Sequence, residues 1–336
     1  MSVTAKDIAN LLNVSPATVS LALNNRPGVS QEMRKQVLET ARQLGYMPPQ
    51  RPATPRKKNV GLLVFKKFST LIEGSLYWFD LASKISECLN SSDYNLILLS
   101  QTAPLTSAQQ YSQICEDCVG VIVIAFEADR RDLEIFEKSR IPTVLIGNYH
   151  DEISLDAVCV NNKRALTLAF KHLYDNGHRK IGFIDSAQHV NSFTNRYHCF
   201  QNLVRKYQIC NDYDYNISLD YGSKLTIHSM KEYLLTKPEL PSAYIAANDT
   251  LAAGTMQALT SFGYHIPDDI CIVGIDDQPI PALSPQLTSI RVPTDDYAQS
   301  AVYLLIKRIE SSVHTPAITI YTGVELVARE SSSKKL

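Results

Sequence analysis

Apolar residues recur at helical spacing in three short stretches between residues 4 and 45, and a polar residue that can cap a helix precedes each stretch. The first stretch places Ile8, Leu11 and Leu12 on one face. Thr4, followed three residues later by Asp7, matches a capping box, in which the hydroxyl accepts from first-turn amides and the carboxylate reaches back. The pattern therefore predicts a first helix that starts at about residue 4.

A second helix follows almost at once. Asn13 lies where the chain must turn, because Asn tolerates a positive φ better than other non-glycine residues. Ser15 can cap the next helix, and Pro16 suits its first turn because no amide is lost there. Val19 and Leu23 give this helix a narrow apolar stripe, so its other face is expected to stay free.

Ser30 and Glu32 open a third helical stretch, which Gly45 closes. Its apolar positions are Val37, Leu38, Ala41 and Leu44. Three capped helices with a tight turn between the first two form the helix-turn-helix arrangement. The other interpretation of this segment is an ordinary helical corner.

From Val60 onward, apolar runs of strand length alternate with helical patterns. The runs are VGLLVF (60–65), YNLILL (94–99), GVIVIA (120–125), PTVLIG (142–147), KIGFID (180–185), SAYIAAN (242–248) and CIVGID (271–276). Helical patterns include 81–89, a stretch from Ser107, one through Leu173, one from Arg196 and one through Leu259. The alternation predicts an α/β core of two doubly wound parallel sheets, and strand ends that face a shared cleft are where ligands bind in such sheets.

Charge is divided unevenly along the chain. Residues 1–58 contain nine Lys or Arg against three Asp or Glu, a net of +6, which leaves 24 against 31, or −7, for the remainder. A basic unit attached to an acidic body is what phosphate binding at one end predicts. The alternative, a solvated basic tail, conflicts with the apolar pattern in which these cations are embedded.

Composition narrows the remaining possibilities. No stretch approaches the roughly 18 apolar residues of a membrane span, and the N-terminus lacks a signal pattern, so we expect a cytoplasmic protein with no membrane partner. Seven cysteines scattered through apolar segments suit a reducing compartment. Cys115 and Cys118 form a lone C-x-x-C without further ligands, which favours core packing over a metal or redox site. We expect no metal and no cofactor.

The stretch VTAKDIANLLNVSPATVSLALNNRPGVSQEMRKQVLETARQLGYMP (3–48) resembles the DNA-binding headpiece of the lactose and galactose repressor family. The resemblance implies base contacts from Pro16, Ala17 and Leu21. It implies further DNA contacts from Thr4, Ser15, Thr18, Ser20, Asn24 and Asn25. Many family members carry Arg where this chain has Leu21, and leucine can make only apolar contact, for instance with a thymine methyl, whereas Arg would bond guanine.

The segment PPQRPATPRKK (48–58) differs from the hinge helix of the family. Its prolines would interrupt a helix, and it has no leucine to wedge into a minor groove. One hypothesis is that Arg51, Arg56, Lys57 and Lys58 form an arm that follows the DNA backbone or minor groove with little bending. The alternative is a stiff spacer without DNA contact.

The rest of the chain resembles the sugar-binding fold that this family shares with periplasmic binding proteins. The matching stretches are HLYDNGHRKIGFI (172–184), AYIAANDTLAAGTMQAL (243–259), IPDDICIVGIDD (266–277), SPQLTSIRVP (284–293) and ELVARES (325–331). The resemblance implies ligand contacts from Arg196, at the opening of a helix, and from Tyr221, Asn248, Asp249 and Asp276. Other interpretations are a helix cap for Asp249, a surface ion pair for Arg196 and core packing for Tyr221.

The first lobe departs from the family. Ser75-Leu76-Tyr77-Trp78 replaces the common Asn-Pro-Phe-Phe, and Asn148 and Asn161 stand where acids are frequent. Loss of negative charge on this side favours a larger, less hydroxylated or anionic effector. Tyr77 and Trp78 are expected to stack on the ligand or, alternatively, to belong to the core or a dimer contact.

These features predict a two-part regulator. The expected divisions are a headpiece (1–46), a linker (47–59) and a core (60–336), with lobe one at about 60–160 and 292–320 and lobe two at about 161–290 and 321–332. The expected function is a repressor, a homodimer on a palindromic double-stranded DNA operator, controlled by a small-molecule effector. A periplasmic-type solute receptor is the alternative, and an enzyme is disfavoured because no catalytic motif appears.

Overall fold

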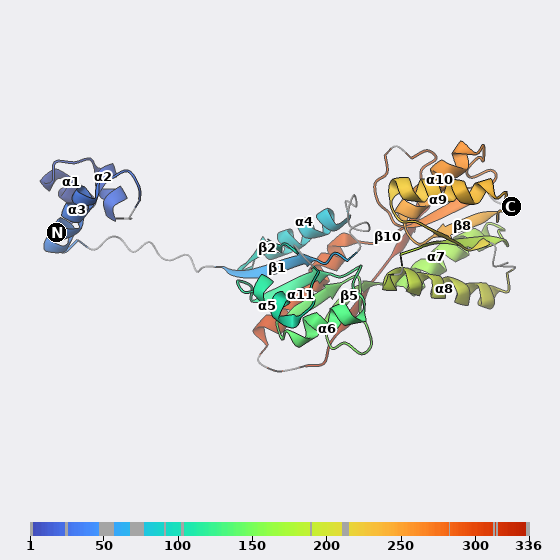
Figure 1. Ribbon diagram of the computed structural model, residues 1–336, viewed down its shortest axis with the longest axis horizontal. Coiled ribbons are helices and arrows are strands. Elements are labelled where there is room, and N and C mark those ends of the chain that lie inside the picture. Colours follow the sequence, from blue (N-terminus) through green and yellow to red (C-terminus); the bar gives the residue numbers. More distant parts are fainter. Residues whose placement is uncertain are drawn as a thin grey trace. The chain divides into compact units, whose positions relative to one another are not determined.

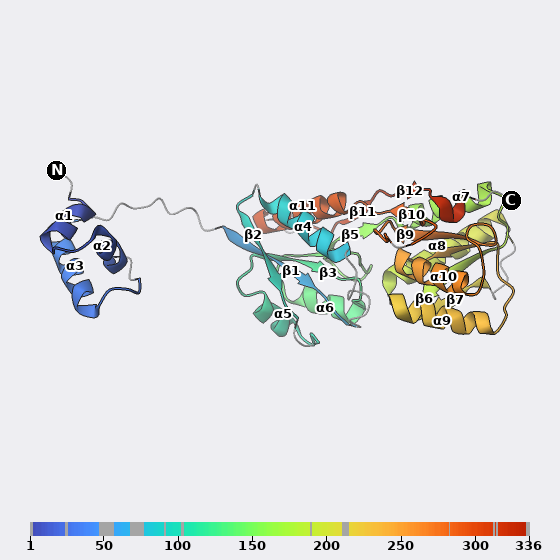
Figure 2. The same cartoon turned by 90° about the horizontal axis from the view of Figure 1, so that it is seen from above.

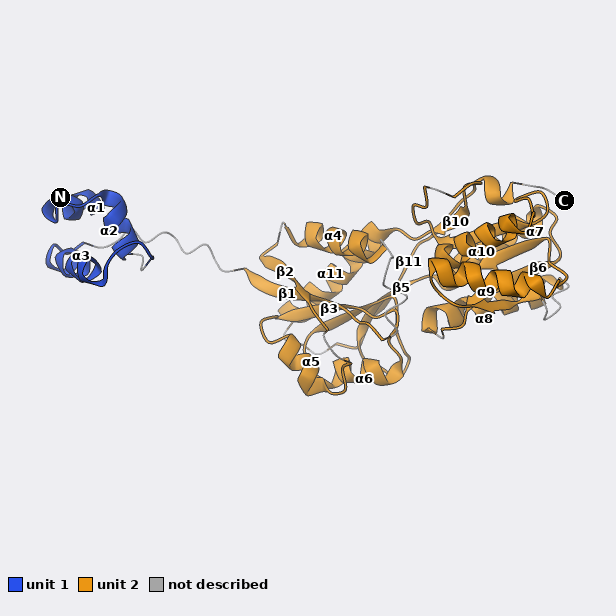
Figure 3. Cartoon of the chain, turned by 45° about the horizontal axis from the view of Figure 1, so that its top comes forward, with its two compact units in different colours: residues 1–56 blue, residues 57–336 orange. Residues whose placement is uncertain are grey.

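The computed structural model describes residues 3–23, 26–46, 57–67, 77–90, 92–101, 104–188, 190–209, 215–281, 283–311, 313 and 315–333. The chain divides into two compact units, residues 1–56 and residues 57–336, which Figure 3 colours separately. The fold of each unit follows from its own sequence pattern.

Unit one contains the three predicted helices, α1 (Ala5–Leu11), α2 (Pro16–Leu23) and α3 (Gln31–Gln43). The predicted capping box is present, with the Asp7 carboxylate accepting from the Thr4 amide at 2.8 Å and from its hydroxyl at 2.7 Å. Ser15 accepts from the Thr18 amide at 3.1 Å, and Ser30 caps α3 through the Met33 amide. Asn13 takes the positive φ, 54°, that the turn requires.

A small core holds these helices together. Its buried side chains are Ile8, Ala9, Val19, Ala22, Val37 and Ala41. The expected stripes were wrong at two positions, because Leu11 is 67% exposed and Leu38 is 48% exposed. Short helices that meet only two neighbours bury a narrower face than their apolar pattern suggests.

The first sheet of unit two has the strand order β11-β5-β4-β3-β1-β2, and all of its neighbours are parallel. Its strands are β1 (Lys58–Val64), β2 (Tyr94–Leu99), β3 (Gly120–Ile124), β4 (Thr143–Ile146), β5 (Asp156–Val160) and β11 (Thr319–Thr322). The accompanying helices are α4 (Tyr77–Asn90), α5 (Ala108–Ile114), α6 (Arg130–Lys138) and α11 (Thr294–Glu310). Helices α4 and α11 pack together, as do α5 and α6 (Figure 2).

The second sheet has the equivalent order β12-β10-β9-β8-β6-β7, in which only the β10–β12 pair is antiparallel. Its strands are β6 (Ile181–Ser186), β7 (Ile217–Leu219), β8 (Ala243–Ala246), β9 (Cys271–Asp276), β10 (Thr288–Arg291) and β12 (Glu325–Val327). Its helices are α7 (Asn162–Asp175), α8 (Asn191–Tyr207), α9 (Ser223–Leu235), α10 (Asp249–Ser261) and the 3-10 turn η2 (Glu330–Ser332). Two doubly wound sheets, as the pattern predicted, make up this unit (Figure 1).

The chain passes between the two sheets three times. It crosses from β5 to α7, from β10 to α11, and from β11 to β12. Each sheet is therefore completed by segments that are distant in sequence, so neither lobe is a continuous piece of chain.

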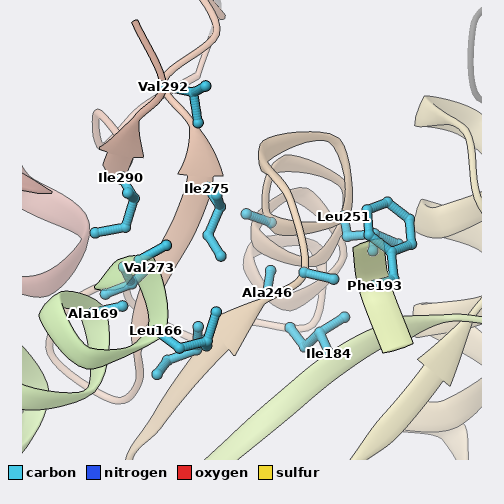
Figure 4. Close-up of a cluster of buried hydrophobic side chains, with 14 of the residues drawn as sticks. Leu166, Ala169, Ile184, Phe193, Ala246, Leu251, Val273, Ile275, Ile290 and Val292 are labelled. Carbon is cyan, nitrogen blue, oxygen red and sulfur yellow. The ribbon is translucent and has the colours of Figure 1, made fainter. Parts of the chain in front are cut away.

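Burial follows the doubly wound plan. Val273 and Ile275 of β9 lie among Leu166 and Ala169 of α7 and Ile290 of β10 in the close-up of the second sheet (Figure 4). Strands covered by helices on both faces read as continuous apolar runs, which is why the sequence revealed them so clearly.

A buried ion pair fixes the edge of the first sheet. The Asp156 carboxylate is 1% exposed and accepts from Nη2 of Arg308 at 2.7 Å and from the Ile318 amide at 2.7 Å. Arg308 also donates to the Thr315 carbonyl at 2.7 Å. The pair thus links the end of α11 to β5 and to the segment that leads into β11.

Arg308→Met is expected to destabilise unit two by about 3–5 kcal/mol, because it leaves the buried Asp156 carboxylate without its counter-charge. Urea unfolding followed by fluorescence of Trp78, the only tryptophan, measures the change. Arg130→Met is the matched control, since Arg130 is 55% exposed and its ion pair with Glu152 is worth about 1 kcal/mol or less. Equal losses in the two variants would contradict this role of Arg308.

Candidate functional site

A cavity of about 390 Å³ lies in unit two and is lined from both sheets. Aromatic side chains and amides dominate its wall. The lining residues are Tyr77, Phe126, Gly147, Asn148, Tyr149, Cys159, Val160, Asn161, Asn162, Lys163, Val190, Asn191, Ser192, Phe193, Asn195, Arg196, Cys199, Tyr221, Asn248, Asp276, Gln278 and Tyr321. This size and mixture suit a small polar ligand with an apolar face.

The parallel sheets explain why these residues meet. Asn148 follows β4, Asn161 follows β5, Asn248 follows β8, and Asp276 ends β9. The carboxyl ends of parallel strands share one edge, and the helices that follow begin at that edge. Side chains predicted from separate motifs therefore converge on one cavity.

Arg196 is the most connected polar residue of the cavity wall. Its Nε donates to the Asn162 side-chain oxygen at 3.0 Å, its Nη1 to the Ala247 carbonyl, and its Nη2 to Asp276 at 3.4 Å. Burial raises the pKa of Asp276, while the Arg196 guanidinium opposes that rise. The prediction that Arg196 opens a helix was wrong, because α8 begins five residues earlier at Asn191 and Arg196 lies inside it.

Asp276 and Asp277 adopt positive φ values of 117° and 54° at the end of β9. Such conformations are costly for residues with a side chain and occur where surrounding contacts over-determine them. The Asp277 carboxylate pairs with Arg329 at 2.6 Å and with Arg291 at 2.7 Å, which anchors the turn and directs Asp276 to the cavity wall.

Tyr221 and Asn248 form a second fixed pair in the wall. Asn248 caps α10 through the Leu251 amide at 3.1 Å, and its Nδ2 donates to the Tyr221 hydroxyl at 3.1 Å. The Tyr221 hydroxyl in turn donates to Thr250 at 3.4 Å. The ring of Tyr221, 4% exposed, thus lines the cavity in a fixed orientation.

Asn148 and Asn191 connect the two sides of the cavity. Asn148 donates to the Ala125 and Ala128 carbonyls at 3.1 and 2.6 Å, and its side-chain oxygen accepts from Asn191 at 2.9 Å. Asn191 also donates to the Tyr149 carbonyl at 2.9 Å. Because Asn191 begins α8 of the second sheet, these bonds join one lobe to the other.

Two predicted ligand residues lie outside the cavity lining. Trp78 stacks on Phe79 with ring centroids 3.6 Å apart and packs against the core. Asp249 is 1% exposed, and its carboxylate accepts from Ser289 at 2.6 Å and from the Gln278 amide at 2.7 Å. The helix cap that might have explained Asp249 belongs instead to Asn248.

Sequence reasoning missed several residues of this wall. Phe126, Tyr149, Asn162, Lys163, Asn191, Phe193, Asn195, Gln278 and Tyr321 were not predicted. Most of them follow a strand or occupy the first turns of α7 and α8, so position after a strand was the signal that could have found them.

The candidate DNA-binding surface lies on α2 of unit one. Ser15, Pro16, Ala17 and Ser20 are exposed, and Leu21 is half-buried. The opposite face of α2 supplies Val19 and Ala22 to the core. Neither Ala17 nor Leu21 is fully buried, so the predicted reading face is open to solvent.

Other predicted DNA contacts fall elsewhere. Thr4 is exposed, Thr18 is half-buried, and Lys57 donates to the Asn90 carbonyl at 3.4 Å. The remaining predicted contacts lie outside the described residues, and these are Asn24, Asn25, Arg51 and Arg56. Ser75 and Leu76 also lie outside them, as does the linker up to residue 56.

Among the described residues, no group of three or more His, Cys, Asp or Glu could hold a metal ion. The thiols of Cys115 and Cys118 are free and pack against the core of the first sheet, and burial raises the pKa of Cys115 to about 12. No helix in the described ranges combines the length and apolar composition needed to cross a bilayer.

A three-helix unit with an exposed central helix, joined to two doubly wound sheets around a cavity, defines a two-part DNA-binding and ligand-binding class of protein. Residues 4–49 match the family model of bacterial regulatory proteins, lacI family, and residues 170–332 match a periplasmic binding protein-like domain. The chain thus combines a DNA-binding domain of the lacI family of bacterial regulatory proteins with a periplasmic binding protein-like domain.

Relatives match over nearly the whole chain. The probable HTH-type transcriptional repressor ExuR of Bacillus subtilis is 27% identical over 98% of both chains. The ribose operon repressor of Haemophilus influenzae is 29% identical over 92% of both chains. Among solved structures, the transcriptional regulator CelR–cellobiose complex has a TM-score of 0.72 at 21% identity, covering 98% of this chain and 99% of that chain.

A lac repressor dimer bound to operator has a TM-score of 0.66 at 20% identity, with 99% of both chains covered. At these identities the two structures support the fold. The two-lobed fold of this chain agrees with the folds of both structures.

Asp249→Asn is expected to change how stability depends on pH. Burial, and then the charge of Asp276, raise the pKa of Asp249 to about 7 in the folded chain, above its ordinary value of 3.8. Its stabilising contribution is therefore fully present below about pH 4 and is lost as the pH rises through about 7, by at most about 4 kcal/mol. The stability of the variant relative to the parent should therefore rise as the pH increases from about 4 to about 7.

Thermal unfolding of both proteins across this range measures the effect. Asp220→Asn, the same change at an exposed position, is the control. Its stability relative to the parent should change little over this pH range. Parallel pH curves for Asp249→Asn and the parent chain would rule out this behaviour of Asp249.

Proposed function

We propose that this chain is a sequence-specific transcriptional repressor whose affinity for DNA is set by a small molecule bound in the cavity of unit two. The proposal rests on one observation, the presence in a single chain of a helix-turn-helix unit with an exposed α2 face and of a ligand-sized cavity between two sheets. The full-length relatives named as repressors support it.

We propose further that the repressor acts as a homodimer on a palindromic operator. A single headpiece contacts too few bases for useful specificity, and two-fold symmetry lets two headpieces reach two half-sites. A candidate dimer surface lies on neighbouring elements of the first sheet, where Phe79 of α4, Leu98 of β2 and Tyr303 of α11 are 57%, 62% and 61% exposed. The solved lac repressor relative is itself described as a dimer bound to operator.

Ligand control would act through the relation between the two sheets. Three chain crossings connect them, and the Asn148–Asn191 bond spans the cavity. A ligand that binds one arrangement of the lobes more tightly than another shifts the population toward that arrangement. The spacing of two headpieces in a dimer would follow that shift.

A periplasmic-type solute receptor shares the cavity but gives no role to unit one. The match of residues 4–49 to the lacI family and the repressor relatives favour the regulator. The proposed function involves no catalytic step.

The test is selection of fragmented bacterial genomic DNA by the purified full chain, followed by sequencing and a gel shift with the enriched site. We expect one or a few palindromic sites to be enriched. Absence of enrichment at low salt would refute the repressor function, because electrostatic attraction is strongest there.

Ala17→Glu is expected to weaken operator binding by about 10-fold or more, because it places a carboxylate on the exposed face of α2 against the acceptors and phosphates of DNA. Gln36→Glu, on an exposed position of α3, adds the same charge and is the control. Gel shifts measure affinity, and thermal unfolding confirms that both variants fold. A similar loss in the two variants would show that only net charge matters.

Leu21→Arg is expected to change base preference rather than remove binding. Leucine offers only apolar contact, whereas an arginine fork bonds guanine through O6 and N7. Selection from an operator library randomised in each half-site should show guanine gained at one position with the variant. An unchanged preference would place Leu21 away from the bases.

A further inference from the structure

Three asparagine side chains of the cavity lining use their oxygens to accept hydrogen bonds from N–H groups of the protein. The side-chain oxygens of Asn161, Asn162 and Asn248 accept from Arg164 N at 2.9 Å, from Arg196 Nε at 3.0 Å and from Leu251 N at 3.1 Å. Each partner is an N–H group, so the atom it meets must be the amide oxygen, and this fixes the orientation of all three amides. The protein itself therefore uses these three acceptors.

The donors at the start of α7 are left for a ligand. Within the described ranges, the Nδ2 groups of Asn161 and Asn162 have no hydrogen-bond partner, and Lys163 forms no ion pair. All three residues line the cavity. The first amides of a helix also lack intrahelical acceptors, so this corner offers several donors at once.

The charged side chains of the cavity lining also favour an anionic ligand. Its charged side chains are Lys163, Arg196 and Asp276, and the last two pair with each other. Among the lining residues that the structure describes, one cation thus remains in excess, in a unit whose sequence is acidic overall, with 26 basic against 31 acidic residues over 57–336. The amino ends of α7 and α8 add positive potential to the same cavity.

We propose that the cavity binds a small organic anion, with its carboxylate or phosphate held at the start of α7 by Asn161, Asn162 and Lys163. This assignment rests on the proposed function and adds the chemical class of its ligand. An ionised oxygen group only accepts hydrogen bonds, which is what a corner rich in donors requires.

The rest of the ligand is expected to be a hydroxylated carbon skeleton. Tyr77, Phe126 and Phe193 give the wall an apolar portion for its C–H groups, whereas Asp276 and Asn195 offer acceptors for hydroxyl donors. Sugar acids and sugar phosphates share this chemistry and differ only in the anionic group.

Titration calorimetry of the full chain against matched pairs tests the proposal. The pairs are gluconate with sorbitol, glucuronate with glucose, and glucose 6-phosphate with glucose. We expect at least one anion to bind more than 10-fold more tightly than its neutral counterpart, and the pair identifies carboxylate or phosphate as the source. Preference for a neutral member, or no binding by any anion at millimolar concentration, overturns the proposal.

Variants of Lys163 test whether the anion binds at the start of α7. Lys163→Gln should weaken binding of the preferred anion by about 10-fold or more, while Lys163→Arg retains most of it. Lys171→Gln is the matched control, because Lys171 is an exposed lysine of the same helix that pairs with Asp175 outside the cavity. Equal affinities for Lys163→Gln and Lys171→Gln would remove Lys163 from the site.

DNA binding separates this proposal from the proposed function. If the chain selects an operator but prefers neutral sugars, the repressor function stands and the anion assignment fails. If anions bind but no DNA site is enriched, the ligand class stands and the repressor function fails.

Discussion

Parallel strands that end together at one edge are the constraint on which the rest of unit two depends. Both sheets use the same order of strands, and helices α4, α7, α8 and α10 start at the cavity. Helix starts carry amides without intrahelical acceptors, so the cavity wall must supply caps or receive a ligand. Asn161 and Asn248 cap α7 and α10, and in each residue the side-chain oxygen accepts a hydrogen bond from a backbone amide of the helix. The local demands of helix ends thus decide the hydrogen-bonding character of the cavity.

Arg196 turns this edge into a fixed surface. Its guanidinium joins the start of α7, the carbonyl that follows β8 and the carboxylate that ends β9. A buried cation with three partners is costly to displace, because its removal leaves those partners without a hydrogen-bond donor and leaves a buried charge uncompensated. The second lobe therefore presents an ordered wall, and Asn191 hydrogen-bonds from it to Asn148 and to the Tyr149 carbonyl of the first lobe. Rigid lobes with few connections are suited to motion relative to each other.

Sequence reasoning succeeded where local physics dominates. The caps at Thr4, Ser15 and Ser30 depend on residues three positions apart. Buried strands are recognisable in the sequence as continuous apolar runs. It failed where packing geometry decides. Leu11 and Leu38 have the periodicity of core residues, yet both are exposed because a three-helix unit is too small to bury every apolar position.

Periodicity and capping are properties of neighbouring residues, so the amino-acid pattern was enough to predict the class of fold, the helix-turn-helix unit, and which strand ends carry polar side chains. Which of those side chains face the cavity depends on packing between segments that are far apart in the chain. Asp249 and Asp276 look alike in sequence, but Asp249 turns toward Ser289 and Asp276 toward Arg196. Asn162 and Lys163 belong to no sequence motif. They line the cavity because α7 follows β5 and therefore begins at the edge where the strands end. Such convergence joins residues that are distant in the chain, and no local pattern encodes it.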